Sequence, residues 1–246
     1  MKSILDEIIS NKLHEVSEKK KKRNFLDVIK NPKVGDISVI AEIKLASPAE
    51  GKLAEKKDII KRAIKYEKSS CDAISLVVDK KYFNGDLEYI KRVKNIVALP
   101  ILAKDFVIDP YQIYEMKSYG ADAILLIAKI IPSDKLVLLV NLAKKLNIEP
   151  VVEVQNKREL DRAIHTDTKL IAVNARNLTT FVIDIDNACK ISKLVPKNFI
   201  SLGFSGVSNR CDAKRYKEAG ARGILVGTSL MKTKNINGLI RELKNL

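Results

Sequence analysis

The sequence contains no tryptophan, only two histidines and only three cysteines among its 246 residues. Both histidines, His14 and His165, fall on predicted helices, which argues against a histidine-based catalytic triad or a histidine-ligated metal. The cysteines stand far apart, at positions 71, 189 and 211, and fit neither a disulfide framework nor a zinc site. Reduced thiols of this kind are typical of the cytoplasm, where we expect the protein to be located.

Long hydrophobic runs are also absent. No apolar stretch approaches the ~20 residues that a membrane helix requires, and the N-terminal segment MKSILDEIISNKLHE has no cleavage site of a secretory signal. We therefore expect no membrane partner. Aromatic residues make up 5% of the chain and hydrophobic residues 46%, so we predict one sizeable core built mainly from Ile, Leu, Val and Ala.

The net charge is +15, which raises the question of a nucleic-acid partner. The densest basic run is EKKKKR at 18–23, and the other lysines are spread over every predicted helix. Spread lysines are typical of solvated helix faces, and they can also attract an anionic substrate. Basic and aromatic residues do not alternate anywhere, so we expect no nucleic-acid partner.

What the chain does have is a repeated unit, in which a short apolar run ends in a polar residue and is followed by a loop and an amphipathic helix. Eight such runs are present, at 38–44, 72–78, 99–104, 122–129, 149–154, 169–176, 198–206 and 222–229. Strands that alternate with helices pair in parallel. Eight units in a chain of this length predict an α/β fold, a single (β/α)8 TIM barrel.

Residues 1–36 precede the first strand, so we divide the chain into a short helical N-terminal extension, 1–36, and the barrel, 37–246. ILDEII and NFLDVIK predict two short helices, the second with Asn24 as its N-cap. Such an extension can cap one end of the barrel or cover the substrate. The loops that follow the first two strands are long, which favours substrate contacts there.

Charged residues close the first and third predicted strands. Glu42 and Lys44 alternate and therefore share a face, where the lysine can compensate an inward carboxylate. A surface ion pair at a fraying strand end is the alternative. Lys104 closes an otherwise apolar strand and is partly desolvated there, which suits a general acid, whereas the alternative is a lysine that reaches out to solvent.

The fifth and sixth strands carry further polar residues. Glu153 has only apolar neighbours in PVVEV, so its pKa should be raised by desolvation, as a general acid or base requires. Asn174 and Arg176 alternate at the next strand end, where an amide and a guanidinium can orient an oxygen-rich ligand. These residues predict acid–base chemistry.

Small residues close the last two strands. Ser205-Gly206 and Gly227-Thr228 each resemble an ordinary turn, but together they occupy the usual phosphate-binding position of such barrels. With two lysines, two carboxylates and an amide, and without a metal cluster, they indicate acid–base chemistry on a small phosphorylated substrate.

Several strings in this sequence resemble indole-3-glycerol phosphate synthase: AEIKLASP (41–48), KKYFNG (80–85), PILAKDFVIDPYQIYE (100–115), GADAILLIAKI (120–130), VVEV (151–154), NARNLTTF (174–181) and LVGTSLMK (225–232). The resemblance extends from about residue 24 to the C-terminus, and the string at 100–115 is its most specific part.

The resemblance implies ring closure of 1-(2-carboxyphenylamino)-1-deoxyribulose 5-phosphate with loss of carbon dioxide and water, without a cofactor. It assigns Lys104 as an acid, Glu153 to later proton transfers, and Lys44 to the substrate carboxylate or a second acid role. Glu42 would orient Lys104. Asn174 would hold substrate hydroxyls, and Arg176 would position neighbouring carboxylates or the substrate. The remaining residues would hold the phosphate (Ser47, Ser205, Gly206, Gly227, Thr228) and the aromatic ring (Pro48, Phe83, Phe106, Leu125, Leu178). We expect a monomer.

This chain departs from the family pattern at three places. Phe204 replaces the glutamate that precedes Ser-Gly on the seventh strand, Val78-Asp79 replaces Thr-Glu, and LASPAEG replaces a more basic loop. A phenyl ring cannot transfer a proton, so a slow synthase is one hypothesis, and a phosphate-binding barrel with lost or redirected catalysis, acting as a binding or regulatory subunit, is the other. If the missing carboxylate limits the rate, Phe204→Glu should raise turnover.

Overall fold

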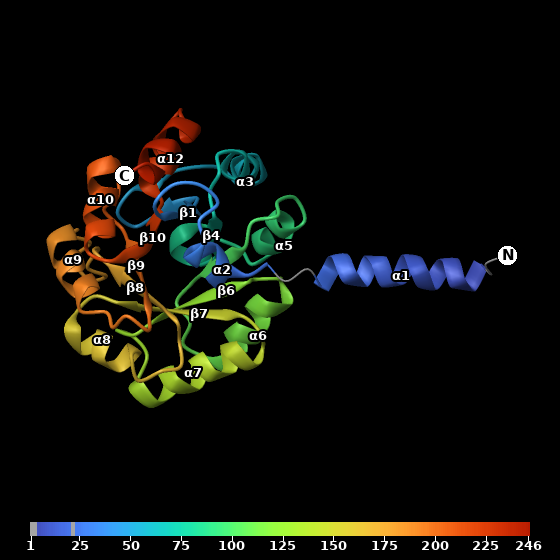
Figure 1. The fold of residues 1–246 in the computed structure, drawn as a ribbon, viewed down its shortest axis with the longest axis horizontal. Coiled ribbons are helices and arrows are strands. Elements are labelled where there is room, and N and C mark those ends of the chain that lie inside the picture. The colour runs from blue at the N-terminus through green and yellow to red at the C-terminus, as the bar shows by residue number, and fades with distance from the viewer. Residues whose placement is uncertain (1–3, 21–22) are drawn as a thin grey trace.

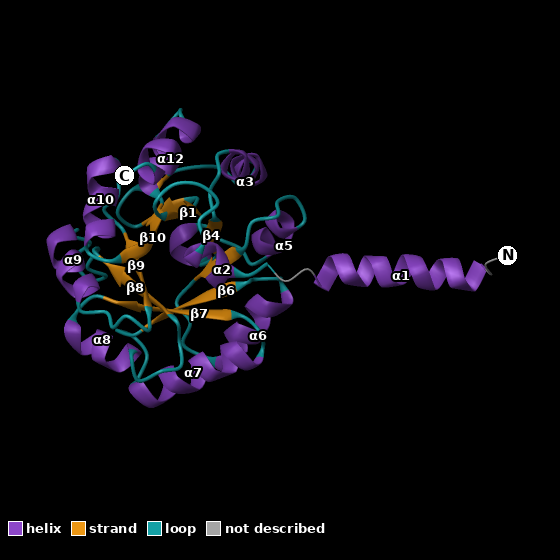
Figure 2. Cartoon of the chain, in the orientation of Figure 1, coloured by secondary structure: helices purple, strands orange, loops and turns teal. Residues whose placement is uncertain are grey.

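The computed structural model describes residues 4–20 and 23–246, and its eight longer strands form a closed parallel barrel (Figures 1 and 2). Each strand pairs with the strands before and after it in the chain, and the first pairs with the last. The barrel strands are β1 (Ser38–Ile43), β4 (Ala73–Val77), β5 (Ile101–Lys104), β6 (Ala123–Ile127), β7 (Glu149–Val154), β8 (Leu170–Asn174), β9 (Ile200–Phe204) and β10 (Ala221–Val226). The predicted TIM barrel is confirmed.

Helices surround this barrel on the outside, as Figure 2 shows. They are α3 (Asp58–Lys68), α4 (Lys80–Phe83), α5 (Glu88–Lys94), α6 (Pro110–Ser118), α7 (Ser133–Lys145), α8 (Lys157–Ala163), α9 (Ile185–Lys193), α10 (Arg210–Glu218), α11 (Thr228–Lys232) and α12 (Ile236–Lys244). His165, expected on a helix, lies in the turn after α8. None of the described helices has the length and apolarity needed to cross a membrane.

Alternation of side chains along the strands creates two apolar layers. On β6, Leu125 and Ile127 point into the barrel, whereas Ile124 and Leu126 pack against the helices. Both faces are buried, so the strands read as continuous apolar runs rather than as alternating ones. The core consists mainly of Ile, Leu, Val and Ala, as the composition predicted.

Two helices precede the barrel. The first, α1 (Ile4–Lys20), is a single long helix where a short one was predicted, and Figure 1 shows it projecting away from the barrel. It includes part of the basic run 18–23, of which residues 21–22 lie outside the described residues. The second, α2 (Phe25–Lys30), begins at the predicted N-cap, where the Asn24 side chain accepts a hydrogen bond from the backbone of Asp27.

Helix α2 closes the N-terminal end of the barrel. Its Phe25 and Ile29 belong to the apolar cluster inside the barrel, and the Ser38 hydroxyl at the start of β1 donates to the carbonyl oxygens of Val28 and Ile29, at 3.0 and 2.9 Å. The extension therefore caps the end of the barrel at which the strands begin.

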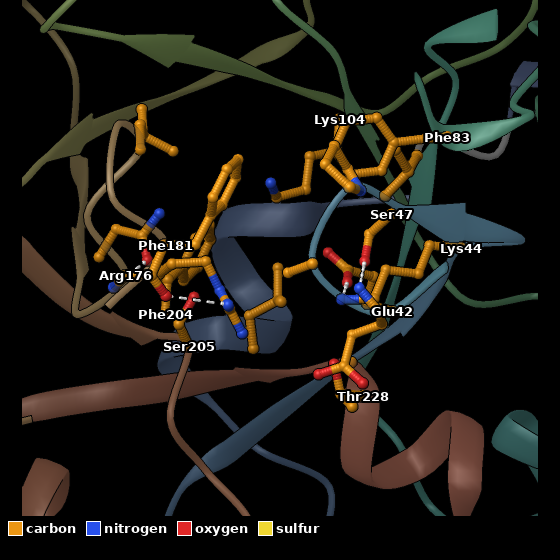
Figure 3. Close-up of a pocket in the computed structure, with 18 of the residues that line it drawn as sticks. Glu42, Lys44, Ser47, Phe83, Lys104, Arg176, Phe181, Phe204, Ser205 and Thr228 are labelled. Carbon is orange, nitrogen blue, oxygen red and sulfur yellow. Dashed lines mark hydrogen bonds and ion pairs between the residues drawn. The ribbon is translucent and has the colours of Figure 1, made fainter. Parts of the chain in front are cut away.

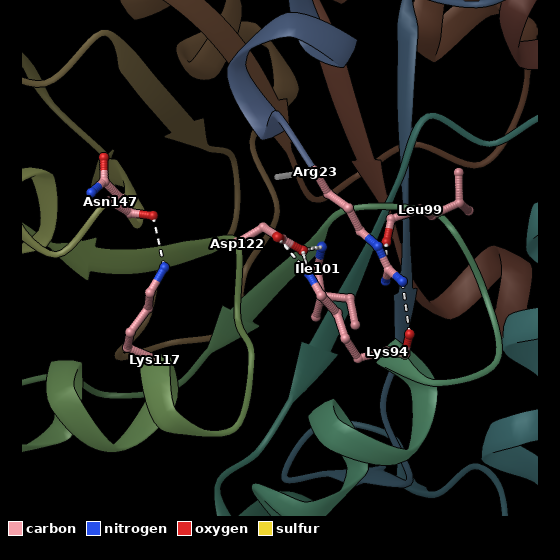
Figure 4. A network of polar contacts seen from close by, with 7 residues as sticks. All are labelled: Arg23, Lys94, Leu99, Ile101, Lys117, Asp122 and Asn147. Carbon is pink, nitrogen blue, oxygen red and sulfur yellow. Dashed lines mark hydrogen bonds and ion pairs between the residues drawn. The ribbon is translucent and has the colours of Figure 1, made fainter. Parts of the chain in front are cut away.

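A polar network anchors the chain next to α2 (Figure 4). The Arg23 guanidinium donates to the carbonyl oxygens of Lys94 and Leu99, at 2.7 and 3.2 Å. The Lys94 ammonium contacts the Asp122 carboxylate at 2.5 Å, and this carboxylate also accepts a hydrogen bond from the backbone of Ile101. These bonds tie the extension to the starts of β5 and β6.

A buried ion pair anchors the last helix to the same end. The Lys244 ammonium, whose side chain is 2% exposed, lies 2.6 Å from the Asp72 carboxylate and also donates to the carbonyl oxygen of Ser70. Asp72 accepts further hydrogen bonds from the backbone of Lys33 and Val39. A single carboxylate thus joins the extension, β1 and α12.

Replacing Lys244 by methionine should therefore destabilise the protein by about 3–5 kcal/mol, because it leaves a buried carboxylate without its cation. Urea unfolding measures the change. Lys157→Met is the matched control, since Lys157 pairs with Asp161 at 2.7 Å on an exposed helix face and should contribute less than about 1 kcal/mol. Equal losses in the two variants would contradict the role given to Lys244.

Candidate active site

A cavity of about 550 Å³ lies at the C-terminal ends of the barrel strands, opposite α2. Fifteen of the sixteen predicted site residues line it: Glu42, Lys44, Ser47, Pro48, Phe83, Lys104, Phe106, Glu153, Asn174, Arg176, Leu178, Ser205, Gly206, Gly227 and Thr228. The exception is Leu125, which is fully buried one layer deeper in the barrel. Ile127, two residues further along β6, lines the cavity instead.

Glu42 and Lys44 form an ion pair on one side of the cavity (Figure 3). The Lys44 ammonium lies 3.0 Å from Glu42 Oε1, and the glutamate is 4% exposed. Gly227 follows the neighbouring strand β10, and a Cβ atom at this position would lie 2.3 Å from Glu42 Oε1. Glycine at this position thus makes room for the carboxylate, and the pair is part of the packed site rather than a surface contact.

Glu153 and Asn174 form a second polar pair, on the adjacent strands β7 and β8. The Asn174 side-chain nitrogen donates to Glu153 Oε1 at 2.8 Å, and Asn174 Oδ1 accepts from the backbone of Arg176 at 3.0 Å. The second contact fixes the orientation of the amide, so that its NH2 group faces the carboxyl. Glu153 is 1% exposed, and its Oε2 atom has no hydrogen-bond partner among the described residues.

The two buried carboxyl groups are shifted in opposite directions. Burial would raise the pKa of Glu42, but the charges of Lys44 and Lys104 and the hydrogen bond from Lys44 outweigh it, and the pKa lies below its ordinary value. Desolvation dominates at Glu153 and raises its pKa, against the weaker effects of Lys104 and Asn174. Two carboxyl groups with separated pKa values are typical of acid–base catalysis.

Lys104 is the last residue of β5, and its positive charge works to lower the pKa of both Glu42 and Glu153. Its side chain lies in the cavity rather than reaching out to solvent. In Figure 3, Lys104 and the Glu42–Lys44 pair enter the cavity from one side, and Arg176 and Phe204 from the other. A ligand in the cavity would therefore lie between the lysines and this second group.

Aromatic rings form the apolar part of the lining. Phe83 and Phe106 contact each other with ring centroids 6.3 Å apart. Phe181 and Phe204 also line the cavity, and Phe204 belongs to the cluster inside the barrel and is 1% exposed. These rings offer a surface against which a flat aromatic ligand can pack.

The loops after β9 and β10 form the remaining part of the lining. Ser205 and Gly206 have φ values of 69° and 80°, which turn the chain sharply as β9 ends. The Ser229 hydroxyl donates to the carbonyl oxygen of Val207 at 2.8 Å and so joins the two loops. The two loops therefore lie together at one end of the cavity, with Ser205–Gly206 on one loop and Gly227–Thr228 on the other.

Sequence reasoning missed several lining residues. Glu50, Asp79, Asp105 and Phe181 all contribute to the cavity. The two aspartates follow the ends of strands, a position that the sequence alone could have indicated. Burial raises the pKa of Asp105. Phe181 could not be found in this way, because its place depends on a left-handed backbone turn with φ of 61°. Among the described residues, no group of His, Cys, Asp or Glu is arranged to hold a metal ion.

The fold and the cavity define a (β/α)8-barrel enzyme whose ionisable side chains meet at the C-terminal ends of its strands. The family model of indole-3-glycerol phosphate synthase matches residues 4–243. The chain therefore belongs to the indole-3-glycerol phosphate synthase family, whose members are lyases of tryptophan biosynthesis.

Individual relatives agree with this assignment. The indole-3-glycerol phosphate synthase of Acetivibrio thermocellus is 38% identical over 221 residues, which cover 90% of this chain and 84% of the relative. The enzyme of the same name from Thermoanaerobacter sp. is 37% identical and covers 98% of both chains. A crystal structure of 3-hexulose-6-phosphate synthase superposes with a TM-score of 0.68 over 85% of this chain and 98% of its own, at 14% identity, a likeness of fold alone.

Glu153→Gln should stabilise the protein at neutral and alkaline pH. The folded-state pKa of Glu153 is raised, so above the ordinary value of about 4.3 the unfolded chain releases this proton more readily than the folded one, and stability falls as pH rises through the folded-state pKa. Glutamine removes this effect. We expect a higher Tm than wild type at pH 8 and an equal Tm near pH 4, and a Tm difference that does not vary with pH would contradict the prediction.

Proposed function

We propose that this chain converts 1-(2-carboxyphenylamino)-1-deoxyribulose 5-phosphate to indole-3-glycerol phosphate, carbon dioxide and water. The observation that carries the proposal is the pair of buried carboxyl groups with opposite pKa shifts, both acted on by Lys104 inside one cavity. Family membership supports the choice of reaction.

In the first step, Lys104 protonates the ribulose carbonyl oxygen while the ring carbon that bears the carboxylate attacks the carbonyl carbon. Glu42 is anionic, in part because the positive charge of Lys104 lowers its pKa. Its negative charge in turn keeps the Lys104 ammonium protonated and oriented. Lys44, paired with Glu42, holds the substrate carboxylate or acts as a second acid. Carbon dioxide then leaves by cleavage of the bond between this ring carbon and the carboxylate, and the electron pair of the broken bond restores the aromatic ring.

In the later steps, a hydroxyl group leaves as water and a ring proton is removed. Glu153 serves these proton transfers, because desolvation raises its pKa above that of an ordinary carboxyl group, which suits it to general acid–base catalysis. Asn174 holds it in place and contacts substrate hydroxyls. Arg176 helps to orient the substrate from the opposite side.

The rest of the cavity provides binding. Ser47, Ser205, Gly206, Gly227 and Thr228 hold the phosphate in the proposal, and Pro48, Phe83, Phe106 and Leu178 pack against the anthranilate ring. We further propose that residues 1–36 form an N-terminal extension that precedes the catalytic barrel of 37–246, and that the protein works as a monomer in the cytoplasm, without cofactor, membrane or nucleic-acid partner.

Lys104→Ala or Glu153→Gln should each lower turnover by at least ~100-fold, the usual scale for a positioned acid or base. Fluorescence of indole-3-glycerol phosphate formed from the synthetic substrate measures this, and circular dichroism verifies that each variant is folded. Near-wild-type turnover in either variant would overturn the roles assigned.

Phe204→Glu distinguishes the two interpretations of the missing family glutamate. The Phe204 ring is buried in the cluster inside the barrel, so a carboxylate there would be surrounded by apolar side chains and desolvated. We therefore expect lower turnover and lower stability than wild type, with Phe204→Leu as the apolar control. Higher turnover in Phe204→Glu would show that the lost carboxylate, and not the packing, limits the rate.

A further inference from the structure

A small hairpin forms part of the cavity rim, within the loop predicted after the first strand. Its strands are β2 (Ala46–Ser47) and β3 (Gly51–Lys52), which pair in antiparallel fashion. The backbone N–H of Glu50 donates to the Ser47 hydroxyl at 3.1 Å. Ser47, Pro48 and Glu50 all line the cavity, so the position of this hairpin helps to set the shape of the site.

An isolated hairpin with two-residue strands is not stable in water, so it needs contacts with the rest of the molecule. One such contact is an ion pair between Glu50 and Lys232, at 2.5 Å. Lys232 is the last residue of α11, the helix that begins at Thr228 on the proposed phosphate end of the cavity. The ion pair thus joins the hairpin to that end of the site.

The charge of Glu50 matters as well as its contact. Lys44 and Arg176 act on this carboxylate electrostatically, which places it in the same field as the cavity cations. The hydrogen bond from Lys232 is the main reason that the pKa of Glu50 is lowered, so the carboxylate is ionised at neutral pH. Without Lys232, an uncompensated negative charge would stand at the entrance used by an anionic ligand.

We propose that Glu50 and Lys232 are positioning residues for ligand binding: their ion pair fixes the 46–52 hairpin against α11 and cancels the Glu50 charge at the phosphate end of the cavity. The identity of the ligand rests on the proposed function. The pair touches no reacting atom in this scheme, so its effect should appear in binding and KM rather than in kcat.

The test compares Glu50→Ala, Lys232→Ala, the double variant and the charge swap Glu50→Lys/Lys232→Glu. Binding of indole-3-glycerol phosphate is followed by its own fluorescence, which requires no turnover. Lys157→Ala is the control, because Lys157 forms a comparably exposed ion pair with Asp161 away from the cavity. KM and kcat for the synthetic substrate are measured alongside.

Lys232→Ala should weaken binding and raise KM by about three- to fivefold, at the upper end of what exposed ion pairs contribute, with kcat within about twofold of wild type. Removing Glu50 as well should restore binding to the level of Glu50→Ala alone, the charge swap should bind like wild type, and added salt should shrink the Lys232→Ala defect.

Wild-type binding in Lys232→Ala, or losses that simply add in the double variant, would overturn the positioning role. A wild-type protein that binds indole-3-glycerol phosphate but forms none from the substrate would overturn the proposed function. The binding comparison among variants would still decide the role of the ion pair in that case.

Discussion

Closure of the barrel, in which β1 pairs with β10 on one side and with β4 on the other, is the constraint on which the site depends. It brings Glu42 beside Gly227, about three quarters of the chain length away, with no room for a side chain between them. The opposite end is held by α2 inside the barrel and by the Asp72–Lys244 ion pair. Packing at one end therefore keeps the strand ends at the other in register, and the chemistry depends on that register.

Within the closed barrel, two carboxyl groups of the same ordinary pKa acquire different roles from their surroundings. Glu42 is buried beside a lysine 3.0 Å away and keeps its charge. Glu153 is buried beside a neutral amide, which contributes a hydrogen bond but no charge. Burying a charge is costly unless it is paired, so the surroundings of Glu42 favour its anionic form, whereas those of Glu153 raise its pKa. Lys104, whose charge acts on both, completes a set that can donate and accept protons in one cavity.

Much of the fold and of the site could be predicted from the sequence, because the ends of the barrel strands can be recognised in it. Apolar runs that end in a charged residue placed Lys104 and Glu153 on strands, and parallel pairing placed the strand ends at one rim. The misses depend on geometry that no local pattern encodes. Leu125 lies on a predicted strand but one layer too deep to line the cavity. Helix α1 extends to Lys20, where a shorter helix was predicted. The contact between Glu50 and Lys232 joins residues 182 positions apart and has no sequence signature.

The most direct measurement is an infrared titration of the carboxyl groups, in wild-type protein and in the Glu153→Gln and Glu42→Gln variants. The account predicts that the carboxyl signal lost in Glu153→Gln titrates at a higher pH than an ordinary glutamate, and that the signal lost in Glu42→Gln titrates at a lower pH. The same titration pH for both signals, or the reverse order, would contradict the division of roles on which this account of the site depends.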